Sequence, residues 1–280
     1  MKEESEKPIE DIAKHVEDSI KKKFHKKLFS RFAKGIVEYE LIQPNDKIAV
    51  CMSGGKDSFV MAKLFQELKR HNKIPFELVF MVMDPGYSKE NREAIERNAQ
   101  LLNIPVTIFE TDIFDSVLNI EKSPCYICAR MRRGHLYHRA KDLGCNKIAL
   151  GHHYDDVIET IVMGMLYGGQ MQTMMPKLKS ANFEGMELIR PMYLIREEHI
   201  KAWRDYNGLN FLQCACKFTK TCNTADTSKR KKVKELIAKL ESEDEGIEQN
   251  IFRSVENVSL KTVIAYKDKD GVKHRFTDDY

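Results

Sequence analysis

The sequence predicts an α/β fold built on a doubly wound parallel sheet of about five strands, with helical extensions at both ends. Short runs of apolar and β-branched residues alternate with segments whose apolar residues recur at helical spacing. This alternation requires right-handed crossovers between parallel strands. A glycine-rich turn, residues 53–58, joins the first of these runs to the next helix. The predicted strands are 47–52, 76–83, 104–109, 147–151 and 186–190.

The predicted helices lie between and beyond these strands. Residues 1–25 are highly charged and carry isoleucine and valine three to four residues apart, which indicates a helix. Residues 28–43 are predicted to form a further helical turn or two that leads into a turn at 44–46. Ser88 is suited to cap the helix at 88–102. Further helices are predicted at 59–72, 126–143, 155–167, 197–206 and 233–240.

Three segments follow from this pattern. Residues 1–43 form a basic, helical N-terminal extension, residues 44–210 the α/β domain, and residues 211–280 a cysteine-bearing, basic and helical C-terminal region. The basic run at 21–27 fits either a solvated helix face or a contact with nucleic-acid phosphates. The end of the chain is weakly patterned, although 272–276 has the character of a short strand.

Composition limits the class of protein. The chain has 280 residues and a net charge of +4, so the distribution of charge matters more than its total. No apolar run is long enough to span a bilayer, and the charged N-terminus lacks the apolar core of a signal peptide. We therefore expect a cytoplasmic protein without a membrane partner. Seven cysteines in a reducing compartment indicate metal binding or catalysis rather than disulfides.

The glycine-rich turn carries the clearest chemistry. It lies between a strand and a helix, where backbone N–H groups and the helix dipole favour an anion such as phosphate. Glycine lets the backbone approach that anion closely, serine adds hydroxyl donors, and Lys56 adds a positive charge. The spacing is not that of a Walker A loop, because Val50 stands where that motif needs glycine and Asp57 follows the lysine. The predicted phosphate-binding residues are Ser53, Gly54, Gly55, Lys56, Asp57 and Ser58.

A second polar segment follows the fourth predicted strand and therefore faces the same end of the sheet. Gly151 begins it, and Asp155 or Asp156 is expected to hold Mg²⁺ on the phosphates. Alternatively, Asp155 only caps the next helix. His152 and His153 fit a packed, hydrogen-bonded role as well as a reactive one.

A CxxC pair lies where a loop enters the helix at 126–143. Its two sulfurs, on Cys125 and Cys128, can reach one metal. The helix N-terminus and the arginines that follow favour the thiolate form. Cys51 and Cys145, in contrast, lie in or beside strands and are expected to be small buried groups. The arginines are Arg130, Arg132 and Arg133.

Three late cysteines, Cys214, Cys216 and Cys222, extend the metal hypothesis. Zinc in a closed structural site takes four ligands, whereas iron–sulfur clusters are also held by thiolates. The Cys214-Ala-Cys216 spacing is too tight for a standard zinc knuckle, so three usable ligands are expected. Three cysteines would leave one iron of a [4Fe–4S] cluster open to a sulfide or a substrate atom.

The glycine-rich turn resembles the PP-loop of ATP pyrophosphatases, which have a Rossmann-like fold and cut ATP between its α and β phosphates. Over residues 27–240 the chain also resembles the tRNA 2-thiocytidine synthetases, on several motifs in the same order. These motifs are Ser53–Ser58, Cys125–Gly134, Ile148–Asp156, Tyr167–Gly169, Met175–Leu178, Ile189–Pro191 and the late cysteines.

The resemblance implies ATP, Mg²⁺ and a [4Fe–4S] cluster as cofactors, and tRNA as substrate. It implies that sulfur, supplied by a cysteine desulfurase or another donor, replaces the C2 oxygen of an anticodon-loop cytidine. A homodimer is a further expectation. The cluster ligands would be Cys125, Cys128 and a later cysteine. The family has a CxxC at the late position, so this chain departs from it. The context Phe211–Cys214 favours Cys214, then Cys216, then Cys222.

The expected mechanism places the ATP phosphates on the PP-loop and the adenosine near Met83 and Asp84. The base oxygen attacks the α-phosphate, and sulfur then displaces AMP. Lys56, Asp57, Asp155 and Asp156 are the candidate catalytic residues. Two alternatives stay open. One is a related sulfurtransferase or desulfidase with another substrate. The other is a non-catalytic RNA-binding sensor of redox state or iron, against which Lys56 and Asp57 argue.

Overall fold

A computed structural model describes residues 9–71, 74–117, 124–212 and 225–279. The chain divides into two compact units. The first contains the chain up to Val157 and residues 175–228, and the second contains residues 158–174 and 229–280. These boundaries differ from those of the three predicted segments. Among the helices of the described ranges, none combines the length and apolar character that crossing a bilayer would require.

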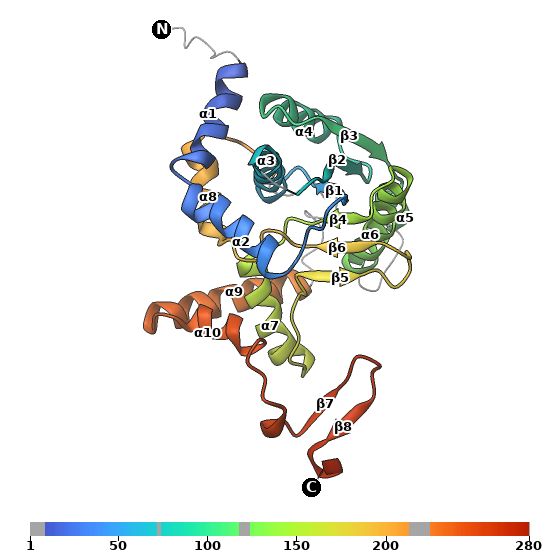
Figure 1. The fold of residues 1–280 in the computed structure, drawn as a ribbon, viewed down its shortest axis with the longest axis vertical. Helices are drawn as coiled ribbons and strands as arrows, with labels where there is room; N and C mark the ends of the chain where they lie inside the picture. Colours follow the sequence, from blue (N-terminus) through green and yellow to red (C-terminus); the bar gives the residue numbers. More distant parts are fainter. Residues whose placement is uncertain (1–8, 72–73, 118–123, 213–224, 280) are drawn as a thin grey trace. The chain divides into compact units, whose positions relative to one another are not determined.

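The first unit is built on a six-stranded sheet with the order β3-β2-β1-β4-β6-β5 (Figure 1). All neighbours are parallel except β5 and β6, which are antiparallel. The predicted α/β fold with a parallel sheet is confirmed. The edge strand β5 was missed, because its three residues are polar at both ends and largely exposed. The strands are β1 Lys47–Met52, β2 Glu77–Asp84, β3 Val106–Glu110, β4 Lys147–Ala149, β5 Lys177–Lys179 and β6 Glu187–Ile189.

The central strand β1 is covered on both faces, which explains its continuous apolar sequence. Alternate residues enter opposite cores because side chains alternate along a strand. Val50 belongs to the core that includes Phe59, whereas Cys51 belongs to the core that includes Tyr137. Two helices contribute to the second core or adjoin it, α5 Ile113–Val117 and α6 Pro124–Asp142. The helices of the first core are α1 Ile9–Lys21, α2 Ser30–Glu38, α3 Lys56–His71, α4 Lys89–Leu101 and α8 Glu197–Tyr206.

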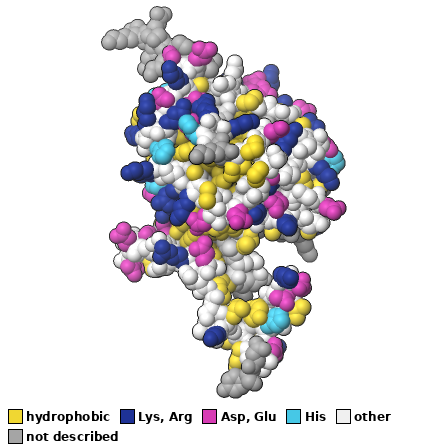
Figure 2. Space-filling model, viewed as in Figure 1, with side chains coloured by type: hydrophobic (Ala, Val, Ile, Leu, Met, Phe, Trp, Pro, Cys, Tyr) yellow, Lys and Arg dark blue, Asp and Glu magenta, His cyan; other side chains and the backbone are white. Residues whose placement is uncertain are grey.

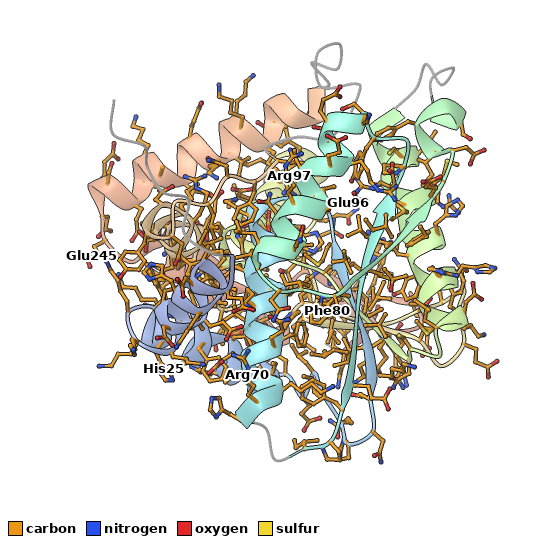
Figure 3. The ribbon with its side chains drawn as sticks, turned by 90° about the horizontal axis from the view of Figure 1, so that it is seen from above. His25, Arg70, Phe80, Glu96, Arg97 and Glu245 are labelled. Carbon is orange, nitrogen blue, oxygen red and sulfur yellow. The ribbon has the colours of Figure 1, made fainter. Side chains whose placement is uncertain are left out.

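The N-terminal helices share the core of the sheet rather than extending from it, since Val16 and Phe32 are fully buried in the first core. A buried ion pair supports this packing: Nζ of Lys63 on α3 lies 2.9 Å from Oε1 of Glu17 on α1. Arg70, labelled in Figure 3 near the far end of α3, lies 2.7 Å from the same carboxylate. Lys23 lies in the segment that connects α1 to α2. Its Nζ is 3.8 Å from the ring centroid of Tyr206 on α8.

The predicted N-cap on α4 is confirmed, because the Ser88 side chain accepts a hydrogen bond from the backbone N–H of Asn91. On the face seen in Figure 2, lysine and arginine side chains are interspersed with aspartate and glutamate. Charge on this face therefore does not gather into one basic patch.

The second unit contains most of α7 Tyr154–Gly168 and α9 Ala225–Glu243, together with α10 Ile247–Ser254 and a hairpin. Its buried apolar residues include Ile158 and Ile161 on α7, Val233 and Ile237 on α9, and Phe252 on α10. The hairpin strands are β7 Ala265–Lys267 and β8 Lys273–Arg275, and β8 falls within the strand predicted at 272–276. Glu159 of α7 is buried, and Arg230 of α9 lies 3.7 Å from it.

Candidate active site

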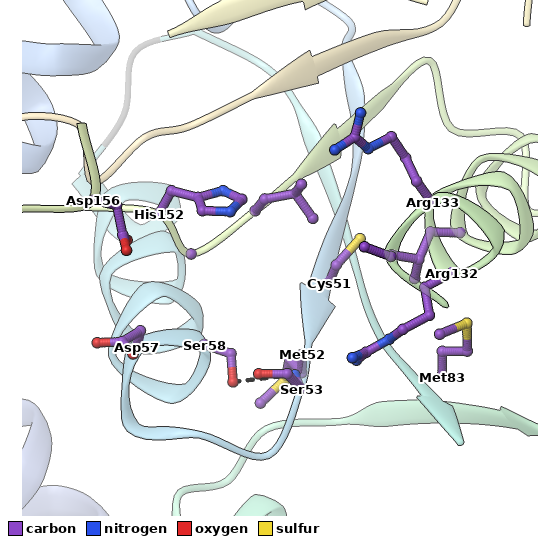
Figure 4. Close-up of a pocket in the computed structure, with 14 residues that line it drawn as sticks. Cys51, Met52, Ser53, Asp57, Ser58, Met83, Arg132, Arg133, His152 and Asp156 are labelled. Atoms are coloured by element: carbon purple, nitrogen blue, oxygen red, sulfur yellow. Dashed lines mark hydrogen bonds between the residues drawn. The ribbon is translucent and has the colours of Figure 1, made fainter. Parts of the chain in front are cut away.

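The sheet changes its winding direction between β1 and β4. After β1 the chain passes through α3 to β2, which lies on one side of β1, and β3 continues the sheet on that side. The next strand, β4, lies on the other side of β1. Ligands of open α/β sheets bind at such a switch point, outside the carboxyl ends of the strands. The loops that follow β1 and β4 both line a cavity of about 370 Å³ there (Figure 4). Its lining is Cys51, Met52, Ser53, Asp57, Ser58, Met83, Ala129, Arg132, Arg133, Leu136, Leu150, Gly151, His152 and Asp156.

The loop after β1 is held in a tight conformation by its own hydrogen bonds. The Ser58 hydroxyl donates to the Gly55 carbonyl over 2.8 Å and accepts the Ser53 backbone N–H over 3.2 Å. Gly54 has a φ of +85°, and a Cβ there would lie 2.8 Å from the Ile95 side chain. Only glycine fits this position without displacement of its neighbours. Because α3 begins at Lys56, the positive end of the helix dipole adjoins the cavity.

Gly151, in the loop after β4, explains how the two loops come together. A Cβ at this position would lie 3.4 Å from both the carbonyl carbon of Asp57 and the backbone nitrogen of Ser58. A Cβ would thus already be in van der Waals contact with the start of α3, and little room remains there for a longer side chain. Gly151 therefore lets the loop after β4 lie close to the loop after β1, and residues of both loops line the same cavity.

Lys56 is held between two carboxylates. Its Nζ lies 3.1 Å from Oδ2 of Asp57 and 3.1 Å from Oε1 of Glu197, the first residue of α8. Burial alone would lower the pKa of Lys56, but the two carboxylates outweigh it and the pKa is raised. The side chain is therefore a fixed cation at neutral pH. It lines a further cavity of about 830 Å³, together with Lys201 and Arg204.

Asp57 and Asp156 bring two carboxylates to the first cavity. Oδ1 of Asp57 is buried, accepts no hydrogen bond and lies 3.9 Å from Nε2 of the buried His153. Oδ2 of Asp156 accepts the backbone N–H of His153 over 3.0 Å, so Asp156 also caps α7. Mg²⁺ commonly takes one or two carboxylates and completes its shell with phosphates and water. Two carboxylates that line one cavity match that pattern.

Asp155 has a different position from its neighbour. Its Oδ2 accepts the backbone N–H of Glu197 over 2.7 Å and lies 3.6 Å from Nε of Arg196. It does not line the cavity. Asp155 therefore caps the start of α8, whereas the cap of α7 that the sequence suggested for it is provided by Asp156.

Met83 and Asp84 also separate at the end of β2. Met83 lines the cavity. The Asp84 carboxylate instead accepts the backbone N–H groups of Gly86 and Tyr87 and lies 2.8 Å from Nη1 of Arg92. Burial would raise the pKa of Asp84, but these partners outweigh it and the pKa is lowered. Asp84 thus shapes its own loop, and of the two residues only Met83 contacts the cavity.

Helix α6 lines the opposite wall. Figure 4 shows Arg132 and Arg133 extending from this helix, across the cavity from His152 and Asp156. Cys128 lies one helical turn before Arg132 and packs, half-buried, against the small cluster that contains Met83. The other proposed metal ligands lie outside the described residues; these are the Cys125 side chain, Cys214, Cys216 and Cys222.

Cys51 also reaches the cavity, but as an unreactive thiol. It is 6% exposed, and burial strongly raises its pKa. Burial likewise raises the pKa of Cys145. Both cysteines are small buried groups, as predicted from the sequence.

Glu197, whose side chain contacts Lys56, was not predicted from the sequence as part of the candidate site. An acidic residue at the start of a helix is expected to interact favourably with the helix dipole. The sequence around Glu197 does not indicate a contact with Lys56. Leu212 was missed in the same way. Its backbone N–H donates to the Gly54 carbonyl over 3.2 Å, which ties the chain that leads into the late cysteines to the PP-loop.

Comparison with known proteins is consistent with this geometry. Residues 16–240 match the PP-loop domain family. The tRNA-cytidine(32) 2-sulfurtransferase of Anaeromyxobacter sp. (strain Fw109-5) is 34% identical over 239 residues, which are 84% of this chain and 77% of the relative. That of Cellvibrio japonicus is 35% identical over 242 residues, with the same coverage. The chain belongs to the tRNA-cytidine 2-sulfurtransferase family. This confirms the resemblance inferred from the motifs and makes the protein a transferase of the PP-loop class.

A solved structure has the same fold. The U34-tRNA thiolase NcsA from Methanococcus maripaludis, determined with its [4Fe-4S] cluster, superposes with a TM-score of 0.61 at 23% identity. The alignment covers 90% of this chain and 81% of NcsA. At this identity the similarity establishes the arrangement of sheet and helices alone.

Proposed function

We propose that the protein is an ATP-dependent tRNA sulfurtransferase that replaces the C2 oxygen of an anticodon-loop cytidine with sulfur. The observation that carries the proposal is that one cavity is lined by two sets of residues, one suited to ATP and the other to RNA phosphates. One wall is the PP-loop with Asp57 and Asp156, and the other is α6 with its arginines. Cys128 lies on that same helix, one turn away. Family membership supports tRNA thiolation as the overall reaction.

In this proposal ATP binds at the switch point with its phosphates on Ser53–Ser58. The φ of Gly54, the start of α3 and the permanent charge of Lys56 all suit an anion there. The adenosine lies toward Met83. Mg²⁺ would be held by Asp57 and Asp156 together with the phosphates, and it would offset charge on the leaving pyrophosphate.

The cytidine C2 oxygen attacks the α-phosphorus of ATP, and the bond to the bridging oxygen of pyrophosphate breaks. The oxygen then carries AMP, which is a good leaving group. Sulfur adds to C2, and the C2–O bond breaks as AMP departs. The arginines of α6, Arg132 and Arg133, are positioned to neutralise phosphate charge on the RNA side of the cavity.

Cys125, Cys128 and Cys214 would hold the [4Fe–4S] cluster, which supplies an open iron that can bind the transferred sulfur. Two observations support a location beside the ATP site. Cys128 packs next to Met83, which lines the cavity, and Leu212 is hydrogen-bonded to Gly54. Cys214 follows Leu212 by two residues in the sequence. Cys51, which is 6% exposed, is not expected to take part in this chemistry.

The test is anaerobic turnover of the reconstituted protein with tRNA, ATP, Mg²⁺ and sulfide. Mass spectrometry of the digested tRNA should detect 2-thiocytidine, and AMP and pyrophosphate should form in equal amounts. Lys56→Ala should abolish both products, whereas Lys34→Ala, which removes an exposed lysine on α2, should not. Formation of ADP, or thiolation of another base, would contradict the proposal.

A further inference from the structure

A second cavity adjoins the one described above. It has a volume of about 580 Å³ and lies between α6 and the segment that begins at β5. Ala129 and Arg133 line both cavities, so they share a wall. The remaining lining residues are Arg130, Gly134, Tyr137, Leu178, Lys179, Ser180, Ala181, Asn182, Phe183 and Leu188.

The charge of this second cavity is of one sign. Arg130, Arg133 and Lys179 line it, and none of its lining residues is acidic. These three cations make no ion pair with a described residue. Arg190, which directly follows β6, does not line the cavity but is close enough for Arg133 to affect its pKa; it is buried, and its Nη1 donates to the Met175 carbonyl. The pKa of Arg190 is lowered to about 10, first by burial and then by Arg133. The cavity therefore attracts an anion.

An aromatic surface lies beside these cations. Tyr137 and Phe183 stack with their ring centroids 5.1 Å apart and their planes 16° from parallel. Tyr137 is buried, whereas Phe183 is half-buried, so one face of Phe183 packs on Tyr137 and the ring forms part of the cavity wall. Asn182, exposed beside it, carries an amide that can both donate and accept hydrogen bonds.

We infer that this second cavity binds a nucleotide of the RNA that adjoins the cytidine under modification. Single-stranded RNA is held by aromatic rings that stack with bases and by arginine or lysine at the phosphates. Phe183 would stack with the base, and Arg130 and Lys179 would bind its phosphates. Arg133, on the shared wall, would contact the phosphate that links this nucleotide to the cytidine in the first cavity.

An aromatic face distinguishes this occupant from an acidic protein segment, for which the cations alone would suffice. It also predicts tolerance of base identity, because every base has a face that can stack. The inference rests on the proposed function, since it assumes that a cytidine of tRNA occupies the first cavity.

The test uses the full-length protein and an anticodon stem-loop with 2-aminopurine on either side of the target cytidine. Binding should quench one of the two labels in the wild type. Phe183→Leu should abolish this quenching and raise the KM for tRNA about tenfold, which is the usual cost of one stacked base. The KM for ATP should stay unchanged. Phe183→Tyr, which keeps an aromatic ring, should retain both quenching and the tRNA KM.

Lys179→Ala and Arg130→Ala should each reduce the salt dependence of tRNA binding by about one unit of logarithmic slope. If the wild type thiolates tRNA but Phe183→Leu keeps the same tRNA KM and the same quenching, the subsite is absent and the proposed function stands. If the variant binds RNA normally but loses affinity for a sulfur-donor protein, the cavity is a protein-docking site and the inference is overturned. If the wild type itself fails to thiolate tRNA, the proposed function fails first.

Discussion

Glu197 places Oε1 3.1 Å from Nζ of Lys56, while its backbone N–H donates to Asp155. The contact joins the start of α8 to the start of α3, two helices far apart in the sequence. Asp155 follows β4, so the loop after β4 is tied through Glu197 to the lysine of the PP-loop. Side chains that do not line the first cavity therefore fix the position of the cation beside it.

We expect Glu197→Gln to weaken ATP use by loosening and partly discharging this arrangement. One lost charge-assisted contact corresponds to about a tenfold fall in kcat/KM for ATP. Steady-state kinetics with pyrophosphate release as readout would measure it. The control is Glu198→Gln, whose side chain is 68% exposed and lies next in sequence. Equal effects of the two substitutions would mean that Glu197 acts only through the general charge of α8.

Substitutions of the adjacent residues Asp155 and Asp156 should have different effects, one on stability and the other on the Mg²⁺ requirement. Asp156→Asn should raise the Mg²⁺ concentration needed for ATP turnover, because Asp156 lines the cavity beside Asp57. Asp155→Asn should chiefly destabilise the protein, by about 1 kcal/mol, since it weakens the cap of α8. Magnesium titration and urea unfolding of both variants separate the effects. A magnesium requirement raised equally by both substitutions would contradict the assignment.

The ion pair between Glu17 and Lys63 should make stability depend on acid pH. Burial alone would raise the pKa of Glu17, but hydrogen bonds from Arg70 and Lys63 outweigh it and lower the pKa from 4.5 to about 2. Because the folded pKa is the lower one, the stabilisation is complete above the unfolded pKa. It is lost as pH falls from 4.5 to about 2.

Glu17→Gln should remove this dependence and cost about 3 kcal/mol at pH 7, because it leaves Lys63 buried without its carboxylate. Urea unfolding at several pH values measures both quantities. The double variant Glu17→Gln/Lys63→Met, which removes both charges, should recover much of the loss. If the double variant is as unstable as Glu17→Gln, packing of α1 rather than charge explains the effect.

Binding of tRNA should weaken with salt through exposed lysines of α9. Within the second unit Arg230 lies 3.7 Å from the buried Glu159, so its replacement would also remove an ion pair. Lys231 and Lys232 are exposed, and replacing both with alanine should reduce the logarithmic salt slope by about two. The loss should be equal across tRNAs, since phosphate contacts carry no sequence information. Fluorescence anisotropy at several salt concentrations would measure the slope, and an effect on a single tRNA would contradict this reading.

The sheet was predictable because burial leaves a local signature. β1 and β2 are covered on both faces and therefore read as continuous apolar runs, whereas β5, with Lys177 and Lys179 around one leucine, has no such signature. The PP-loop was predictable for a similar reason, since Gly54 must adopt a positive φ between a strand and a helix.

Which residue of an adjacent pair lines the first cavity could not be predicted from the sequence. Met83 and Asp84 are neighbours, as are Asp155 and Asp156, and in each pair only one residue lines the first cavity. The choice depends on distant partners: Arg92 and its own loop for Asp84, and the start of α8 for Asp155. Such pairings arise from the tertiary fold, and no local pattern indicates them.

The cluster gives the sharpest test of the proposed chemistry. Two thiolates of a CxxC pair cannot anchor a [4Fe–4S] cluster alone, so a late cysteine is required. Cys128→Ser and Cys214→Ser should each lose iron and thiolation together, whereas Cys222→Ser should keep both. Cys216→Ser should have a smaller effect, because two ligands separated by one residue crowd a single cluster. Iron and sulfide analysis of anaerobically purified variants, with absorption spectra, would measure the result.

Lys56→Ala provides the matched control for the cluster, since it should abolish turnover and leave the iron content unchanged. Removal of the iron by a chelator should have the converse effect: ATP should still bind, because the proposed phosphate site, Ser53–Ser58 with Asp156, includes none of the proposed cluster ligands. Thiolation should stop. If Cys214, Cys216 and Cys222 can each be replaced without loss of iron, the three-cysteine cluster does not exist in this chain. Cys125 and Cys128 would then be a zinc or redox pair beside a PP-loop.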